Sequence, residues 1–207
     1  MIKLCVFDFD STLMDGETID FLAEPLGLSE KVAAITERAM QGELDFFESL
    51  TTRVGLLKGL DIVKADAICQ SLPYMPGAKE TIKTLKEKGM KVVVFSGGFR
   101  HATDFAKGEL GFDADFANVL HVKDDKLTGL VGGDMMFDHS KGDMMRRLQT
   151  LLGISPEETM AVGDGANDRS MFANAALKVA FCAKPILKEH ANAIVDKKNL
   201  TEILNYL

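Results

Sequence analysis

The feature that most constrains the fold is a short apolar run that recurs along the chain and ends each time in a polar cluster. Three such runs cover Ile2–Phe9, Lys91–Phe95 and Thr159–Val162. A short apolar run with this ending is typical of a buried strand in a parallel sheet. Two weaker strand candidates follow at Lys178–Phe181 and Ala193–Val195. The chain is therefore predicted to contain a sheet of several buried strands.

Helices are predicted between these strands. Ala78, Ile82 and Leu85 fall on one helical face, and Gly89 stops that helix. A second helix is expected over Arg100–Leu110. The apolar face of a third helix is expected to consist of Met144, Leu148, Leu151 and Leu152. Strands that alternate with helices indicate βαβ units, so the predicted fold class is α/β, with a Rossmann-like, mostly parallel sheet flanked by helices.

The segment 16–72 interrupts this alternation, because it contains no convincing strand. Its apolar residues recur at helical spacing in three groups, for example at Phe46, Leu50 and Val54. We therefore expect a core formed by residues 1–14 and 75–207, with a helical domain inserted after the first strand at 15–74. A small β-hairpin insert is expected at Leu120–Met136.

Composition narrows the class of protein. The chain has 207 residues and a net charge of −7, and an acidic chain is a poor candidate for binding nucleic acid. No apolar run approaches the roughly 18–20 residues of a membrane span. Asp8 and Asp10 interrupt the first apolar stretch, which argues against a signal peptide. The three cysteines, Cys5, Cys69 and Cys182, are interpreted as buried free thiols in a reducing compartment, so a cytoplasmic location is expected.

The polar clusters at the strand ends are the candidate site. Ligands of parallel α/β sheets bind outside the carboxyl ends of the strands, where these clusters would meet. The residues concerned are Asp8, Asp10, Thr12, Ser96, Gly97, Asp164, Asn167 and Asp168. Several carboxylates that lie close together need a cation, and oxygen ligands without His or Cys suit Mg²⁺. The alternative is that each Asp is a surface or capping residue.

The sharpest signal is Asp8-Phe9-Asp10. Alternate residues of a strand point the same way, so both carboxylates are expected to reach one phosphate, while Phe9 points into the core. One carboxylate can attack phosphorus, and the other can protonate the leaving oxygen and later activate water.

Ser96-Gly97-Gly98 precedes a predicted helix and can bind an anion there. Lys141 also opens a helix, where it can neutralise phosphate charge unless it is a solvated surface residue.

These motifs resemble those of the haloacid dehalogenase superfamily of phosphohydrolases. Asp8–Thr12 is similar to its first motif, Ser96–Gly98 to its second, Lys141 to its third and Gly163–Asp168 to its fourth. The resemblance covers the whole chain and places a cap domain at the helical insert. A carboxylate at Asp10 points to the phosphatases of the superfamily, because its dehalogenases lack one at that position.

Within the superfamily, the chain is similar to the phosphoserine phosphatase family. The similarity lies in Asp15–Asp20, Phe95–Phe99, Val162–Asp168 and Ala180–Pro185. The resemblance implies hydrolysis of O-phosphoserine, the last step of serine biosynthesis, through a phosphorylated aspartate. The predicted partner is this small molecule, with no nucleic acid and no membrane, and the choice between a monomer and a homodimer stays open.

The resemblance also implies roles for single residues. Asp8 is then the nucleophile and Asp10 the general acid and base. Mg²⁺ is held by Asp8, the main-chain oxygen of Asp10 and Asp164, with Asp168 in support. The implied phosphate-binding residues are Ser96, Gly97, Lys141 and Asn167.

Four residues of the insert are implied to bind the rest of the substrate. Glu17 meets the substrate ammonium and Arg53 its carboxylate, which an Arg can grip in two places. Met40 and Phe46 close over the substrate. Without the resemblance, all four are interpreted as surface contacts or as core of the insert.

Three rival functions stay open. A phosphotransferase would pass the phosphoryl group to another hydroxyl, such as that of homoserine. A phosphatase for sugar phosphates or other small esters would use the same core. A phospho-receiver module would store phosphate on Asp8 without hydrolysing it, although a carboxylate at Asp10 that activates water argues against storage.

Overall fold

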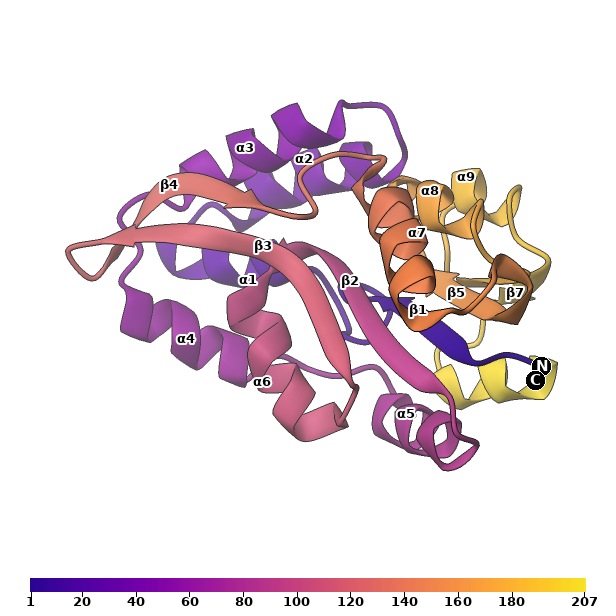
Figure 1. Cartoon of the computed structure of the whole chain (residues 1–207). Coiled ribbons are helices and arrows are strands. Elements are labelled where there is room, and N and C mark those ends of the chain that lie inside the picture. The colour runs from indigo at the N-terminus through magenta and orange to yellow at the C-terminus, as the bar shows by residue number, and fades with distance from the viewer.

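The computed structural model describes all residues, 1–207, and contains one seven-stranded sheet in the order β4-β3-β2-β1-β5-β6-β7 (Figure 1). All neighbouring strands are parallel except β3 and β4. The strands are β1 (Leu4–Asp8), β2 (Lys91–Phe99), β3 (Ala114–Lys123), β4 (Lys126–Gly133), β5 (Thr159–Gly163), β6 (Leu177–Phe181) and β7 (Ala193–Val195). This confirms the predicted α/β class and the mostly parallel sheet.

Helices cover both faces of the sheet, and the strand residues alternate between two apolar cores. Leu4 and Val6 of β1 pack in the core under α7 (Ser140–Leu152), α8 (Arg169–Phe172) and α9 (Pro185–Lys188). Cys5 and Phe7 pack in the opposite core, under α5 (Ala78–Glu87), α6 (Arg100–Leu110) and the 3₁₀ helix η4 (Leu200–Tyr206). The period of two therefore sends neighbouring β1 residues to opposite faces.

Four helices lie between β1 and α5, where the helical insert is predicted. They are α1 (Thr18–Ala23), α2 (Ser29–Met40), α3 (Phe46–Leu56) and α4 (Ile62–Gln70). Asp45 and Asp61 cap α3 and α4 by accepting hydrogen bonds from main-chain N–H groups of the first turn. The chain enters and leaves this segment side by side, because Met14 and Tyr74 form an antiparallel bridge. The division of the chain into domains at 14/15 and 74/75 stays a prediction.

The β-hairpin differs from the prediction. It is not a separate insert, because β3 begins at Ala114 and pairs in parallel with β2, with Val93 opposite Ala114. The hairpin of β3 and β4 is thus the edge of the main sheet, closed by a turn in which Asp124 and Asp125 have φ of 50° and 57°. Two such residues are the requirement of a type I′ turn. The first half of β3 is too polar to stand out as a strand in the sequence.

Three smaller expectations were wrong. β2 does not end at Phe95 but continues to Phe99, with a register shift against β3 after Ser96. Leu151 and Leu152 do not join the buried face of α7, since they are 81% and 39% exposed. Cys182 is exposed rather than buried.

The hairpin also contacts the insert. The main-chain N–H of Gly59 donates to the carbonyl of Leu127, and the N–H of Leu127 donates to the carbonyl of Leu60, both at 2.8 Å. Ile62 N–H donates to the carbonyl of Asp125 at 2.9 Å. The loop between α3 and α4 is therefore attached to the edge of the sheet by backbone hydrogen bonds.

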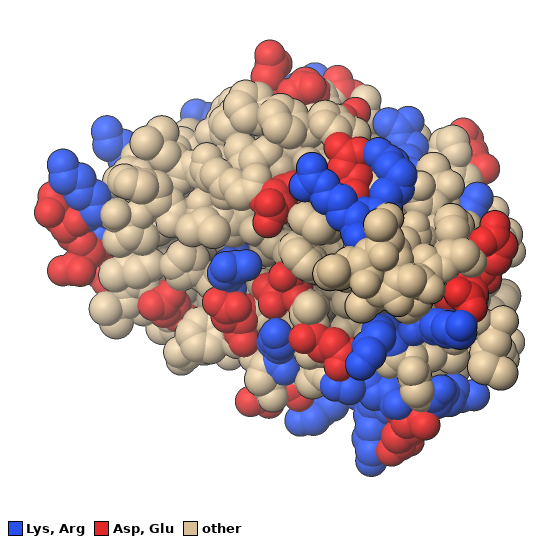
Figure 2. All heavy atoms as spheres, in the orientation of Figure 1, with Lys and Arg blue, Asp and Glu red and all other residues tan.

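The surface carries charges of both signs. Figure 2 shows Lys and Arg most densely over the lower right of the view, where α5 lies, with Asp and Glu among them. A broad area over the upper part of this face carries neither. None of the helices is both long enough and apolar enough to cross a lipid bilayer.

Candidate active site

The polar ends of β1, β2 and β5 meet under the insert, as the sequence predicts. A pocket there is lined from the core and from α1, α2 and α3 of the insert. Its lining consists of Asp8, Asp10, Glu17, Ile19, Met40, Phe46, Leu50, Arg53, Gly97, Gly98, Phe99 and Asn167. All four residues predicted for the insert are thus brought to the same pocket as the aspartates of β1.

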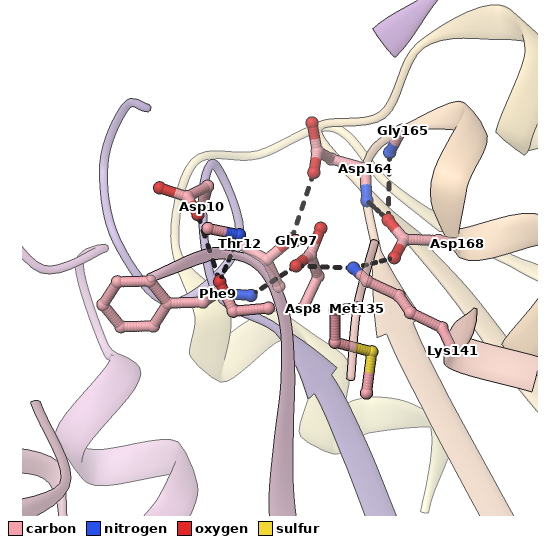
Figure 3. Close-up of polar contacts among 12 residues, drawn as sticks. Asp8, Phe9, Asp10, Thr12, Gly97, Met135, Lys141, Asp164, Gly165 and Asp168 are labelled. Carbon is pink, nitrogen blue, oxygen red and sulfur yellow. Dashed lines mark hydrogen bonds and ion pairs between the residues drawn. The ribbon is translucent and has the colours of Figure 1, made fainter. Parts of the chain in front are cut away.

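Asp8 and Asp168 are joined by Lys141, as Figure 3 shows. The Lys141 ammonium lies 2.7 Å from Asp8 Oδ1 and 2.6 Å from Asp168 Oδ1, and all three residues are buried. The N–H of Phe9 also donates to Asp8 Oδ1, while Phe9 itself is fully buried in the core. No residue donates a hydrogen bond to Asp8 Oδ2, so that oxygen is left for a ligand.

The loop after β5 holds Asp164 beside this chain of charges. Asp168 Oδ2 accepts hydrogen bonds from the N–H groups of Asp164 and Gly165, at 3.0 and 3.1 Å. Both oxygens of Asp168 are therefore occupied, and Asp168 shapes the loop. Gly163 is required here, because a Cβ on it would lie 2.3 Å from Asp168 Oδ2. Asp164 keeps its carboxylate available, with only a 3.5 Å contact from the Thr12 hydroxyl.

Oxygens of Asp8, Asp164 and Asp168 lie within 4.8 Å of one another, and all three residues are buried. Burial raises the pKa of Asp164, and the neighbouring Asp8 raises it further. Burial and Asp168 also raise the pKa of Asp8, against the effect of Lys141. One ammonium does not balance three buried carboxylates, and their oxygens suit a hard cation. The donor set therefore fits a divalent metal ion.

Asp10 lies in the turn after β1 and faces away from the metal cluster (Figure 3). Its Oδ1 accepts hydrogen bonds from the N–H and the hydroxyl of Thr18, both at 2.6 Å, and its Oδ2 accepts one from Ser96 at 3.3 Å. Burial raises the pKa of Asp10, and the Thr18 and Ser96 donors oppose this rise. A carboxyl in these surroundings is suited to carry a proton.

The second predicted motif is not at a helix N-terminus. Ser96 and Gly97 lie in the irregular end of β2, and α6 begins only at Arg100. Asn118 of β3 donates to the carbonyl of Gly97 at 3.0 Å and so fixes this segment. A Cβ on Gly97 would lie 2.8 Å from the ring of Phe46. The glycine therefore lets an aromatic ring of the insert approach the strand.

Asn167 carries a buried polar atom without a hydrogen-bond partner. Its side-chain oxygen is buried and has no hydrogen-bond partner, which costs free energy unless a ligand supplies a donor. Asn167 lines the pocket beside Gly97, and Met40 of α2 packs against the neighbouring Gly165. The amide of Asn167 is thus placed for a polar group of a bound molecule.

Glu17 and Arg53 face the pocket from the insert. Glu17 accepts a hydrogen bond from the Ser11 hydroxyl at 2.6 Å. Burial, with the charge of Asp10, raises the pKa of Glu17 to about 8. Arg53 is 4% exposed and forms no ion pair with any carboxylate of the chain, and burial lowers its pKa. A guanidinium in this position is suited to an anionic group of a ligand.

Sequence reasoning missed the residues that hold these groups. Thr18 binds Asp10, Ser11 binds Glu17 and Asn118 fixes Gly97. Thr18 could have been found from the sequence, because it lies inside a motif of the phosphoserine phosphatase family. No sequence pattern marks Asn118, because only the pairing of β3 with β2 brings it to the site.

Residues 2–176 match the haloacid dehalogenase-like hydrolase family. The phosphoserine phosphatase of Wolinella succinogenes is 63% identical to the chain over 206 residues, and the match covers 100% of both. The phosphoserine phosphatase of Methanocaldococcus jannaschii is 51% identical, with 99% of this chain and 97% of the relative covered.

Solved structures agree with these relatives. A phospho-aspartyl intermediate analogue of phosphoserine phosphatase is 50% identical, with a TM-score of 0.97 and coverage of 100% of this chain and 99% of the other. A substrate-bound phosphoserine phosphatase complex has the same TM-score, identity and coverage. The chain therefore belongs to the haloacid dehalogenase-like hydrolases, in the same family as the phosphoserine phosphatases.

Proposed function

We propose that this chain is a phosphoserine phosphatase, which hydrolyses O-phosphoserine to serine and phosphate through an aspartyl-phosphate on Asp8. The observation that carries the proposal is the environment of the two carboxylates. Lys141 and the N–H of Phe9 bind Asp8 Oδ1 and leave its Oδ2 free, while burial raises the pKa of Asp10 and favours its protonated form. A nucleophile and an acid thus lie beside one pocket.

In the first step, Asp8 Oδ2 forms a bond to phosphorus, and the bond from phosphorus to the serine oxygen breaks. The proton of the Asp10 carboxyl moves to that oxygen, so serine leaves as a neutral hydroxyl. Lys141 and the N–H of Phe9 hold Asp8 Oδ1, which aims the other oxygen at the pocket. Ser96, the N–H of Gly97 and the side-chain NH₂ of Asn167, which lies beside Gly97, donate to the phosphoryl oxygens.

In the second step, water attacks phosphorus. The Asp10 carboxylate takes a proton from that water, and the bond between phosphorus and Asp8 Oδ2 breaks. Phosphate leaves, the Asp8 carboxylate is restored and Asp10 carries a proton again. Thr18 and Ser96 keep Asp10 in place through both steps.

Asp8, Asp164 and the main-chain oxygen of Asp10 would hold Mg²⁺ in this proposal. Asp168 supports them by fixing the loop of Asp164 and the ammonium of Lys141. When bound, the ion would supply positive charge that offsets the repulsion between the phosphoryl group and the Asp8 carboxylate. Without the ion, the burial of three carboxylates around one ammonium leaves negative charge uncompensated.

The insert selects the substrate in this proposal. Glu17 binds the ammonium of phosphoserine and Arg53 its carboxylate, while Met40 and Phe46 cover it. The names of the relatives at 63% and 51% identity support phosphoserine as the substrate. We expect the insert to open around 14–16 and 75–77 for exchange of substrate and product. An identical arrangement of insert and core with and without ligand in solution would contradict this motion.

A phosphate-release screen tests the proposal. Phosphoserine, sugar phosphates and other small phosphate esters are each assayed with Mg²⁺ and with a chelator. Asp8→Asn should lower release from phosphoserine by several orders of magnitude, since the nucleophile is lost. Asp66→Asn is the matched control, because Asp66 lies on α4 and makes no side-chain hydrogen bond. Equal turnover of all esters, or full activity of Asp8→Asn, would refute the proposal.

A phosphotransferase is the rival with the same first step. It differs in the second step, where an alcohol such as homoserine would replace water. The assay is repeated with homoserine, and phosphorylated homoserine is sought as a product. Its formation at the expense of free phosphate would favour the transferase.

A further inference from the structure

The Arg53 guanidinium is fixed by a chain of side chains that runs through three helices of the insert. Its Nη1 donates to the Thr36 hydroxyl at 3.0 Å, and its Nε donates to the carbonyl of Ser49 at 3.1 Å. The Thr36 hydroxyl in turn lies 3.3 Å from Asp20 Oδ1. Asp20 belongs to α1, Thr36 to α2 and Arg53 to α3. Of these hydrogen-bonded residues, only Arg53 lines the pocket.

The arrangement leaves the guanidinium available to a ligand. A guanidinium has five N–H donors, and two are used here, so three remain. Arg53 is buried, and its two hydrogen-bond partners are uncharged oxygens, so its charge has no carboxylate in direct contact. A carboxylate matches the free donors, because the guanidinium fork can bind both of its oxygens.

Asp20 does not contact Arg53 through a hydrogen bond; the Thr36 hydroxyl connects the two side chains. If Asp20 paired with the guanidinium directly, it would compete with a substrate carboxylate for the same donors. Instead the Thr36 hydroxyl lies between them and accepts from Arg53. The hydroxyl has a single proton, which it gives either to Asp20 or to the carbonyl of Val32 at 3.0 Å. Either bond polarises the hydroxyl and strengthens its acceptance from Arg53.

We infer that Thr36 and Asp20 are positioning residues for recognition of the substrate carboxylate, acting through Arg53. The inference rests on the proposed function, because it assigns the carboxylate of phosphoserine to Arg53. Thr36 orients the fork of Arg53 toward the pocket, and Asp20 supports the buried positive charge without occupying its donors. Substitution of Thr36 or Asp20 should therefore change the binding only of substrates that carry a carboxylate.

Two substrates that differ in one group test this. Phosphoethanolamine has the phosphate and the ammonium of phosphoserine but lacks its carboxylate. Thr36→Val, which keeps the shape and removes the hydroxyl, should raise KM for phosphoserine by about tenfold, with a smaller change in kcat. KM for phosphoethanolamine should not change. Thr36→Ser, which restores the hydroxyl, should return KM to the wild-type value, and Asp20→Asn should give a smaller rise than Thr36→Val.

Controls separate this from general damage to the insert. Thr51→Val is matched to Thr36→Val, because the Thr51 hydroxyl binds only carbonyls of its own helix. In the background of Arg53→Met, which itself should raise KM for phosphoserine, Thr36→Val should have no further effect. An equal rise in KM for both substrates, an unchanged KM, or a full effect in the Arg53→Met background would overturn the inference.

Failure of the proposed function looks different. In that case the wild-type protein itself would not prefer phosphoserine to phosphoethanolamine. A different result is that the wild type shows the preference and Arg53→Met loses it, while Thr36→Val and Asp20→Asn keep it. In that case the proposed function stands, and the positioning role of Thr36 and Asp20 is refuted.

Discussion

The Lys141 ammonium lies 2.7 Å from Asp8 Oδ1 in a site where both side chains are almost fully buried. Burial alone would lower the pKa of Lys141, but Asp168 and Asp8 outweigh it and raise that pKa. The ammonium that binds the proposed nucleophile therefore comes from a residue 133 positions away in the sequence (141 − 8).

Removal of this ammonium should destabilise the metal-free fold. Lys141→Met leaves two buried carboxylates without their cation, and the loss of one partner from a buried ion pair costs about 3–5 kcal/mol. We expect the loss at neutral pH in a chelator, and a smaller one at acidic pH, where the carboxylates take up protons. Denaturant unfolding measures the loss of unfolding free energy at both pH values. Lys88→Met, at an exposed position, is the control, and a loss that does not depend on pH would contradict the interpretation.

The role of Asp10 as a proton donor predicts a dependence on the leaving group. Asp10→Asn should lower release from phosphoserine by about 10²–10⁴-fold, because the serine oxygen is a poor leaving group without a proton. p-Nitrophenyl phosphate has a leaving group that needs no proton, so its first step should be much less affected. Burst kinetics with the two esters make the comparison, and equal losses of the first step would argue against a proton donor.

Glu17 should make the stability of the fold depend on pH. Its pKa rises from the ordinary 4.5 to about 8 in the folded chain, so the folded state binds the extra proton between these values. The stability that Glu17 contributes is thus complete below pH 4.5 and is lost as the pH rises through about 8. Glu17→Gln removes this dependence.

The measurement is the free energy of unfolding of the wild type and of Glu17→Gln across this pH range, without metal. The variant should gain relative to the wild type as the pH rises. Glu80→Gln, at an exposed position of α5, should follow the wild type. A constant difference between Glu17→Gln and the wild type would show that Glu17 ionises normally.

Metal binding should stabilise the fold through Asp164. A ligand that binds only the folded state adds about 2.7 kcal/mol at a hundred times its Kd. Thermal unfolding of the wild type should therefore shift upward with Mg²⁺ and return with a chelator. Asp164→Asn should lose most of this shift, whereas Asp66→Asn should keep it. A full shift in Asp164→Asn would remove Asp164 from the proposed metal ligands.

Much of the fold followed from local patterns. The buried strands were predicted from short apolar runs. The insert was predicted from apolar residues at helical spacing and the lack of strand patterns. Where burial depends on distant partners, the patterns failed. The start of β3 at Ala114 is fixed by pairing with β2, and Leu151 is exposed although it is apolar.

The sequence by itself determined which chemical groups stand at the strand ends, because each motif is contiguous and its strand is set by nearby residues. Tertiary structure alone decided how these groups are paired. It placed Lys141 between Asp8 and Asp168 and turned Asp10 toward Thr18. It also brought Arg53 of α3 into a hydrogen bond with the Thr36 hydroxyl of α2. The physical reason is that charge pairing and burial depend on distances in space, which no spacing along the chain encodes.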